Sequence, residues 1–300
     1  MPGLVIANFG NNLIIETAAG ETLSCVARRK LGLLVCGDRI GWQRSEDNDC
    51  IVVQREERVT ELARPDKQGR KKVIAANVEQ MLIITSPKPA FNPGLIDRYL
   101  VAAETLHIQP VIVLNKIDLL DSAEEQSIQQ QLDIYRATGY PVITTSVKTI
   151  HGLEKLQLQL RNHTSIFVGQ SGVGKSSLIN AILPDAKART GDISQASGKG
   201  THTTTTAWLY HLPDGNGAVI DSPGVREFGL WQIDPQTAAA GFREFREFAE
   251  HCRFRNCLHK GEPGCAVKAA QQEGKIASQR LESYHRILAS LEENNGQDIR

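Results

Sequence analysis

Eight consecutive residues near the middle of the sequence have the pattern of a phosphate-binding loop. Residues 169–176 match Gly-x-x-x-x-Gly-Lys-Ser, between a predicted apolar strand over Ser165–Val168 and a predicted helix over Ser177–Leu183. The strand and helix argue against a chance glycine-rich turn. Backbone N–H groups and the helix N-terminus attract phosphate there. The predicted nucleotide-binding residues are Gly169, Gln170, Ser171, Gly172, Val173, Gly174, Lys175, Ser176 and Ser177.

Two of these residues have a predicted chemical role. We expect Lys175 to bind the β- and γ-phosphates of a nucleoside triphosphate and so to take part in catalysis. We expect the Ser176 hydroxyl to coordinate Mg²⁺. The loop alone does not distinguish ATP from GTP, so the base must be selected elsewhere in the sequence.

A second element favours guanine. Asn115-Lys116-Ile117-Asp118 follows a predicted apolar strand over Val111–Leu114. A carboxylate at Asp118 accepts hydrogen bonds from N1–H and N2–H₂ of guanine, whereas adenine would leave it unpaired at a cost of about 1–3 kcal/mol or more. We expect Asn115 to tie this loop to the base and to the phosphate loop, and the Lys116 stem to cover the purine.

Two further elements complete the predicted nucleotide site. Thr145-Ser146-Val147-Lys148 resembles the loop whose backbone N–H meets O6 of guanine, although Ser-Val-Lys departs from the usual Ser-Ala-Lys; the predicted contacts are Ser146, Val147 and Lys148. Asp221-Ser222-Pro223-Gly224 follows a predicted strand over Ala218–Ile220. We expect Asp221 to bind Mg²⁺ through water and the Gly224 N–H to sense the γ-phosphate.

The order of these elements differs from that in Ras-like GTPases, where the guanine-binding element follows the phosphate loop. Here Asn115–Asp118 precedes Gly169–Ser176. The same pocket forms if the original termini of the fold are joined and the chain is opened elsewhere, which is tolerated because the termini of compact domains lie close together. The sequence therefore predicts a circularly permuted GTPase domain.

The surrounding composition is that of a globular protein of two or three domains. The 300 residues are 41% hydrophobic, and 34 basic residues balance 34 acidic ones, which excludes nucleic-acid binding driven by a large net charge. Apolar segments alternate with helical stretches between residues 66 and 230, which predicts an α/β domain with a mostly parallel sheet. One such helix, over 122–138, has a predicted capping box of Ser122 and Glu125 and stops at Gly139.

The first 65 residues have the pattern of a small all-β domain. Short apolar segments recur at the spacing typical of such folds, over Leu4–Ile6, Leu13–Ile15, Leu23–Val26, Leu33–Val35 and Ile51–Val53. Five strands in this length suit an OB-fold barrel, a fold that often binds RNA. A β-domain that only packs against its neighbour is the alternative. The basic stretch Asp66–Lys72 is interpreted as a linker or mobile loop.

The last segment, residues 231–300, is predicted to be helical and to bind one structural Zn²⁺. Asp234-Pro235 starts a helix that continues to about Glu250, and two more helical stretches follow the cysteine cluster. Three thiolates and an imidazole make a closed tetrahedral site. The predicted ligands are Cys252, Cys257, His259 and Cys265, with His251 as a competing ligand. Without an export signal, we expect reduced thiols and this metal site rather than disulfides, and no apolar run is long enough to cross a membrane.

The ordered set of motifs resembles the RsgA (YjeQ) family of circularly permuted GTPases, which act on the small ribosomal subunit. The likeness runs from the OB-like N-terminus to the cysteine knuckle and includes Ala75–Gln80, Asp97–Leu100 and Gly200–Thr205. The resemblance implies a cytoplasmic GTPase that binds late precursors of the small subunit, is stimulated by that subunit and leaves after hydrolysis. We expect a monomer that binds GTP or GDP with Mg²⁺ and contacts rRNA, with no membrane partner.

Hydrolysis needs a group other than the usual glutamine after Asp-x-x-Gly, because Val225 occupies that position. His202, in the threonine-rich switch, is the candidate for orienting or activating the water, as the resemblance also suggests; a contact with solvent or rRNA alone is the alternative. Either Thr203 or Thr204 is expected to complete the Mg²⁺ shell, and the sequence does not separate them.

Basic residues offer a route to rRNA despite the zero net charge. They group at Arg28–Lys30, at Arg70–Lys72, on the helix before the knuckle (Arg243, Arg246) and around it (Arg253, Arg255, Lys260). Interleaved glutamates also suit a merely solvated helix surface. A GTP-gated rRNA-binding module with incidental hydrolysis is the alternative function, and a P-loop ATPase or kinase is a third, disfavoured by Asp118.

Overall fold

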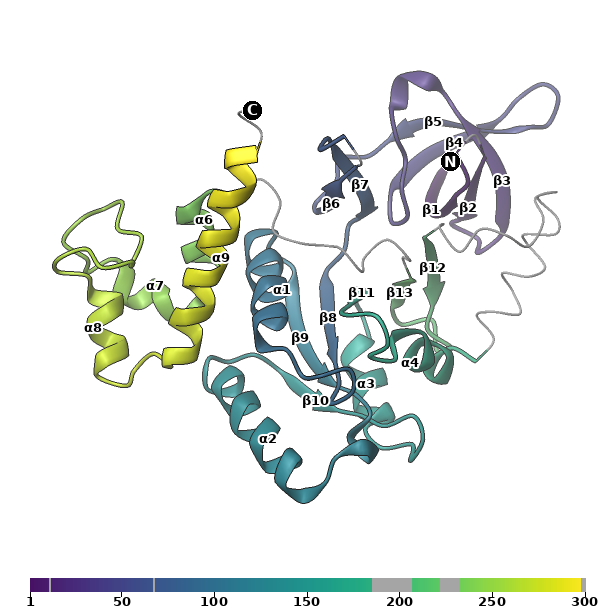
Figure 1. Ribbon diagram of the computed structural model, residues 1–300. Helices are drawn as coiled ribbons and strands as arrows, with labels where there is room; N and C mark the ends of the chain where they lie inside the picture. The colour runs from purple at the N-terminus through teal and green to yellow at the C-terminus, as the bar shows by residue number, and fades with distance from the viewer. Residues whose placement is uncertain (11, 67, 185–206, 222–232, 298–300) are drawn as a thin grey trace.

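The computed structural model describes residues 1–10, 12–66, 68–184, 207–221 and 233–297. Figure 1 shows three parts: an N-terminal barrel, a central sheet with helices, and a C-terminal group of helices on the far side of the sheet from the barrel. None of the helices in these ranges combines the length and the apolar composition needed to cross a bilayer.

The N-terminal part is a closed five-stranded barrel, as the strand spacing predicted. The strands pair in the order β1-β2-β3-β5-β4, and β4 returns to β1 to close the barrel. Val5, Ile15 and Val52 point into its core because alternate residues of each strand face inward. The bounds are β1 Pro2–Asn8, β2 Leu13–Thr17, β3 Thr22–Ala27, β4 Arg39–Arg44 and β5 Cys50–Arg55.

The predicted strand over Leu33–Val35 is wrong. These residues follow the short 3-10 helix η1, Arg29–Leu31, as irregular chain, and the fourth strand is β4. Leu34 and Val35 are buried, so the apolar signal marked core residues correctly. The strand itself was missed because β4 carries only two buried residues, Ile40 and Trp42, among polar ones.

Reduced thiols were also a wrong prediction for two cysteines of the barrel. Cys25 and Cys50 form a disulfide between β3 and β5. The two strands are parallel neighbours with Cys25 opposite Cys50, and the Cα atoms lie 4.5 Å apart, which is within disulfide range. No local sequence pattern indicates this pairing, because it arises from the strand register.

The segment interpreted as a linker is part of a β-hairpin. Strands β6 (Glu61–Pro65) and β7 (Lys71–Ala76) pair in antiparallel fashion as a separate two-stranded sheet. The Asp66 carboxylate accepts hydrogen bonds from the backbone N–H groups of Gln68 and Arg70, which closes the turn. The hairpin includes residues on both sides of the predicted domain boundary between residues 65 and 66. That boundary stays a prediction.

The central part is the predicted α/β domain. Its strand order is β10-β9-β8-β11-β13-β12, and all neighbours are parallel except β12 and β13. All six residues of β8 are buried, as expected for a strand in the middle of a sheet covered on both faces. The strands are β8 Gln80–Thr85, β9 Gln109–Leu114, β10 Val142–Thr144, β11 Thr164–Val168, β12 Trp208–His211 and β13 Ala218–Asp221.

The two helices predicted in this domain begin within two residues of their expected positions, as α2 Ser122–Ala137 and α4 Lys175–Ile182. Helices α1 Pro93–Thr105 and α3 Leu153–Leu160 had no predicted bounds. The capping box of α2 lies one residue earlier than predicted, with Asp121 as N-cap and Glu124 as its partner. Asp121 has an acceptor as good as a serine hydroxyl, so the two registers looked alike in sequence.

The sheet of the central domain continues into the barrel. β12, a strand that the sequence pattern did not predict, pairs with β1 through Ala7 and Trp208. The buried Cys36 thiol lies 2.9 Å from the carbonyl of Ile6 and 3.1 Å from that of Ala207, and burial raises its pKa. These contacts fix the barrel to the strand that lies beside β13.

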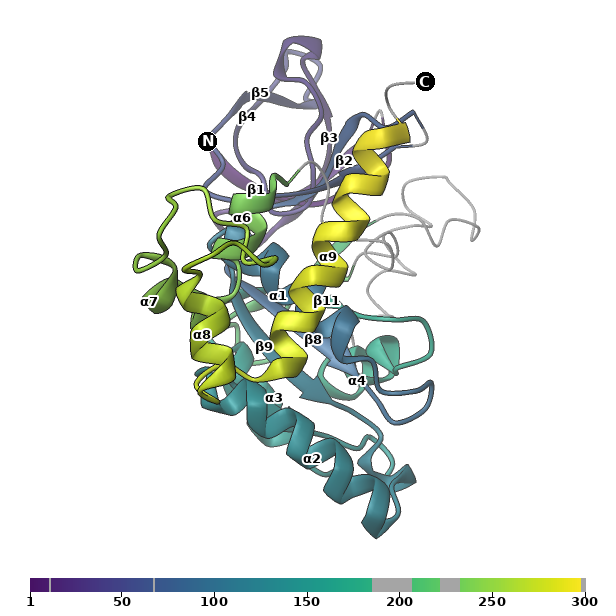
Figure 2. The same cartoon turned by 60° about the vertical axis from the view of Figure 1, so that its left-hand side comes forward.

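Of the C-terminal helices, α6 and α9 pack against α1 (Figure 2). Helix α6 begins at Pro235 with Asp234 as N-cap, as predicted, but it ends at Ala240 instead of reaching Glu250. The chain bends at Gly241, where a Cβ atom would lie 2.7 Å from the Val101 side chain. The remaining helices are α7 Arg243–Ala249, α8 Ala266–Gln272 and α9 Ser278–Gln297.

A buried charged cluster joins these helices to the central domain. The Arg280 side chain, 1% exposed, pairs with Asp97 of α1 and, at 2.5 Å, with Glu244 of α7. The guanidinium also lies 4.5 Å from the ring centre of Phe242. Burial disfavours its charge, but the two carboxylates raise its pKa, so Arg280 stays protonated.

Candidate nucleotide-binding site

The phosphate loop connects the end of β11 to the start of α4, and its glycines are required by close backbone contacts. Gly169 has φ 136°, and a Cβ atom there would lie 2.2 Å from the carbonyl oxygen of Ile84. Gly174 has φ 95°, and a Cβ atom there would lie 2.4 Å from the Asn115 side chain. The loop is therefore wedged between β8 and the guanine-binding element.

The two predicted phosphate and magnesium ligands lie in the first turn of α4. The Lys175 ammonium donates hydrogen bonds to the carbonyls of Gly169 at 2.6 Å and Gln170 at 2.8 Å, so it lies over the loop. Ser176 and Ser177 are exposed beside it. Backbone N–H groups at a helix N-terminus and this ammonium present positive charge to one place, as phosphate binding requires.

The guanine-binding element touches the phosphate loop directly. Asn115 is 1% exposed, and its side-chain amide donates to the carbonyl of Val173 at 2.9 Å. Lys116, in the left-handed region with φ 62°, donates from its ammonium to the carbonyl of Gly172 at 2.5 Å. Two residues at the end of β9 are thus bonded to two residues of a loop that comes more than fifty residues later in the chain.

The Asp118 carboxylate, on the 3-10 turn η2 (Ile117–Leu119), is held by the third loop. Ser146 donates from its hydroxyl to Asp118 at 2.5 Å, and Thr145 donates to the Asn115 side chain at 3.1 Å. Paired backbone hydrogen bonds between Ser146 and His151, both 3.0 Å, close this loop. The half-buried Val147 and the exposed Lys148 lie within it. Asp118 is therefore oriented before any base binds.

The sheet order explains why the elements meet despite their order in the chain. β8 lies between β9 and β11, so the loops after these parallel strands emerge at one edge of the sheet. Asp221 ends β13, the other neighbour of β11, and lies at the same edge, half-buried. His202, Thr203, Thr204 and Gly224 lie outside the described residues.

A loop that the sequence analysis did not single out also lines the site. Residues 86–92 follow β8, and the carbonyl of Lys88 accepts a hydrogen bond from the Lys116 ammonium at 3.2 Å. The Pro89 ring lies 3.5 Å from the position of a Cβ atom on Gly172. The sequence contained a signal that could have identified this loop. The segment follows a predicted central strand, and loops at the carboxyl ends of parallel strands commonly line the ligand site.

The predicted zinc ligands form a compact cluster. The ligand atoms of Cys252, Cys257, His259 and Cys265 all lie within 4.8 Å of one another, whereas His251 is exposed outside the cluster. Nδ1 of His259 lies 3.4 Å from Sγ of Cys265 and 3.7 Å from Sγ of Cys252.

Burial disfavours the charged forms of these side chains when no cation is bound. It raises the pKa of Cys257 to about 12 and that of Cys265 as well, and it lowers the pKa of His259. A divalent ion stabilises the thiolates and accepts the neutral imidazole, so the four side chains fit Zn²⁺. The carbonyl of His259 and Nε2 of His285 lie 2.9 Å apart, which fixes the loop to α9.

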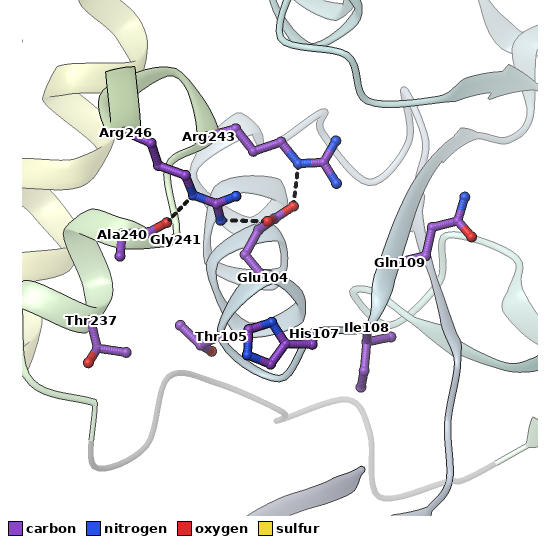
Figure 3. Close-up of a pocket in the computed structure, with 10 residues that line it drawn as sticks. All are labelled: Glu104, Thr105, His107, Ile108, Gln109, Thr237, Ala240, Gly241, Arg243 and Arg246. Atoms are coloured by element: carbon purple, nitrogen blue, oxygen red, sulfur yellow. Dashed lines mark hydrogen bonds and ion pairs between the residues drawn. The ribbon is translucent and has the colours of Figure 1, made fainter. Parts of the chain in front are cut away.

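A cavity of about 640 Å³ lies elsewhere, between the end of α1 and helices α6 and α7 (Figure 3). Its main polar contact is the Glu104 carboxylate, which accepts hydrogen bonds from Arg243 at 2.5 Å and Arg246 at 2.7 Å. The two guanidinium groups share this one carboxylate, so the ion pairs join α7 to α1. The cavity is a crevice beside an ion pair, away from the loops that carry the predicted chemistry.

Comparison with known proteins agrees with the geometry. Residues 55–231 match the family described as RsgA GTPase. The chain is 49% identical over 297 residues to the small ribosomal subunit biogenesis GTPase RsgA of Hahella chejuensis, covering 98% of this chain and 85% of that protein. It is 47% identical over 293 residues to the protein of the same name in Pseudomonas aeruginosa, covering 98% and 86%.

Solved structures are similar over nearly the whole chain. YjeQ from Thermotoga maritima matches with a TM-score of 0.81 and 33% identity, covering 97% of this chain and 98% of that one. YloQ, described as a circularly permuted GTPase, matches with a TM-score of 0.78 and 31% identity, covering 98% and 95%. The predicted permutation and barrel are thereby confirmed, and the chain belongs to the RsgA GTPase family.

Proposed function

We propose that this protein binds GTP with Mg²⁺ at the edge of the central sheet and hydrolyses it in the course of small ribosomal subunit biogenesis. The hydrogen bond from Asn115 to the carbonyl of Val173 carries the first half of the proposal, because it joins a base-selecting loop to a phosphate loop. The names of the relatives at 47–49% identity support the second half.

Each side chain of the described site has a proposed role. Asp118, oriented by Ser146, accepts the two N–H groups of the guanine edge, and Lys116 covers the purine. Lys175 swings from the carbonyls of Gly169 and Gln170 to the β- and γ-phosphates, a move that exchanges two neutral acceptors for charged ones. We assign Ser176 and Asp221 to Mg²⁺, which would supply charge neutralisation at the phosphates when bound.

Activation of the water is assigned from the sequence. Val225 stands where a glutamine orients the water in many Ras-like enzymes, and its side chain has no polar atom. We assign the water to His202 and the last Mg²⁺ position to Thr203 or Thr204. A histidine in place of the usual glutamine is an unusual group for positioning the water. We therefore expect slow GTP turnover by the protein alone and faster turnover when it is bound to the small subunit.

The cysteine cluster is proposed to hold one structural Zn²⁺. Four protein ligands leave no open position for chemistry, so the metal stabilises the knuckle and its packing on α9. We propose the small ribosomal subunit and its rRNA as the partner, a cytoplasmic location because that partner is cytoplasmic, and a monomeric state, which light scattering on the purified protein tests.

GTP turnover with and without purified small ribosomal subunits tests the function. The proposal predicts at least about tenfold stimulation by subunits, which corresponds to about 1.4 kcal/mol of transition-state stabilisation. GTP-dependent subunit binding with unchanged turnover would favour the alternative, a GTP-gated rRNA-binding module. Equal competition by ATP would contradict the guanine assignment.

A further inference from the structure

The zinc knuckle presents an exposed aromatic side chain between two arginines. Arg253, Phe254 and Arg255, here called the knuckle tip, lie between the ligands Cys252 and Cys257, and all three side chains are exposed. The Phe254 side chain is 41% exposed, whereas Phe242 and Phe245 pack in the core against Tyr284. An exposed aromatic ring offers a flat face on which another ring can stack.

The backbone holds the tip in one shape. The N–H of Cys257 donates to the carbonyl of Phe254 at 3.2 Å, and the N–H of Arg253 donates to that of Gly264 at 3.0 Å. Cys252 and Cys257 anchor both ends of the tip in the ligand cluster. A rigid loop loses little conformational entropy on binding, so an exposed ring there is well placed for recognition.

The charges of the tip are uncompensated, unlike those of its neighbours. Lys260 pairs with Glu292 at 2.5 Å, and Arg243 and Arg246 share Glu104. Within the part of the chain that the structure describes, neither Arg253 nor Arg255 forms an ion pair with a carboxylate. The guanidinium carbon of Arg253 lies 5.5 Å from the ring centre of Phe254, so a positive charge lies next to the exposed ring.

We propose that Phe254 stacks on an unpaired RNA base while Arg253 and Arg255 contact the phosphates on either side of it. An aromatic ring beside guanidinium groups that have no carboxylate partner matches the alternating bases and phosphates of single-stranded RNA. An apolar pocket of a protein would bury the ring but leave two charges without partners, at a desolvation cost. This inference rests on the proposed function and adds the type of RNA structure that the knuckle recognises.

The test measures binding of the full-length protein to purified small ribosomal subunits at several salt concentrations. Phe254→Ala is expected to weaken binding about 5- to 150-fold without changing the salt dependence, because stacking carries no charge. Phe254→Tyr keeps the ring and should bind within about twofold of wild type, whereas Phe254→Leu should behave like the alanine variant. Arg253→Ala and Arg255→Ala should each reduce the slope of log affinity against log salt by about 0.7–0.9.

Two controls make the result specific. Leu158→Ala removes another apolar side chain, 53% exposed on α3, and should leave binding unchanged. Zinc content of one per chain in every tip variant shows that the knuckle is folded. A short single-stranded RNA of mixed sequence, used alone, should show the same order of affinities.

Binding by Phe254→Ala equal to wild type would overturn the inference. So would full binding by Phe254→Leu, because any apolar side chain would then serve and a subunit protein would be the contact. Failure of the wild-type protein to bind subunits at all would instead refute the proposed function, so the two failures are distinguishable.

Discussion

The side chain of Asn115 connects the loop after β9 to the phosphate loop after β11, so replacing it tests whether the two loops act as one site. Replacing it with alanine removes the hydrogen bond to the carbonyl of Val173 at 2.9 Å and the one from Thr145 at 3.1 Å. Both bonds are buried, since Asn115 is 1% exposed and Val173 2%. Two buried hydrogen bonds contribute about 0.5–1.5 kcal/mol each, and an unpaired buried carbonyl adds about 1–3 kcal/mol.

The expected loss is therefore about 2–6 kcal/mol. Nucleotide binding should bear most of it, because the two bonded loops are proposed to hold opposite ends of GDP. Calorimetric titration should find GDP affinity lowered by about 30-fold or more. The unbound Asn115→Ala protein should lose a smaller part as a lower Tm. Thermal unfolding with and without saturating GDP separates the two effects, because a ligand stabilises the folded state according to its affinity.

Ser290→Ala is the matched control. It removes a side-chain hydrogen bond of similar length, 2.9 Å, from Arg98 to Ser290 between α1 and α9, far from both loops in the chain. GDP affinity of this variant should equal that of wild type. If folded Asn115→Ala protein bound GDP within threefold of wild type, the two loops would not act as one site, and the reasoning would be refuted.

Four other perturbations have defined outcomes. Asp118→Asn should weaken GTP binding about tenfold or more and improve xanthosine triphosphate binding, since an amide donates to the extra carbonyl of xanthine; unchanged preference for GTP would exclude Asp118 as the selector. Arg280→Met should lower the free energy of unfolding in urea by about 3–5 kcal/mol, because Asp97 and Glu244 lose their buried cation. The control Arg136→Met, at an exposed ion pair, should lower it by under about 1 kcal/mol. Equal losses would contradict a stabilising role for the buried Arg280 cluster. Hydrogen bonds from Lys71 and Arg58 lower the pKa of Glu61 below 4.5. The ionised carboxylate therefore adds to the free energy of unfolding above that pH, and this addition is lost as the pH falls through the lowered pKa. The stability deficit of Glu61→Gln should vanish in acid, and a deficit that stays constant with pH would refute the assignment. Chelation should remove one zinc per chain and unfold the knuckle while GDP affinity persists, and unchanged circular dichroism after zinc loss would show that the metal is not structural.

Local patterns were sufficient to predict where the described motifs lie, because each motif carries its own structural context. The phosphate loop, the element Asn115–Asp118 and the ligand cluster lie where strands, turns and cysteine spacing placed them. Continuous apolar runs in the sequence identified β8, β9 and β11, because central parallel strands are apolar throughout. The reversed order of the motifs did not obscure the fold, since the loops are positioned by strand neighbours.

The features that sequence reasoning missed depend on contacts between distant segments. The disulfide of Cys25 and Cys50 follows from the register of β3 and β5, which no local pattern encodes. β12 escaped because a four-residue strand with one buried residue resembles a loop. Arg280 was not singled out from the sequence, and only the packing of α9 on α1 shows that it is buried between two carboxylates.

The central claim is that one GTP bridges the loops after β9 and β11. The most direct measurement is a crystal structure of the full chain with Mg²⁺ and a non-hydrolysable GTP analogue. We expect the Asp118 carboxylate within about 3 Å of N1 and N2 of the guanine, and the Lys175 ammonium within the same distance of the β- and γ-phosphates. A nucleotide bound with its base away from Asp118, or at a different edge of the sheet, would contradict the account.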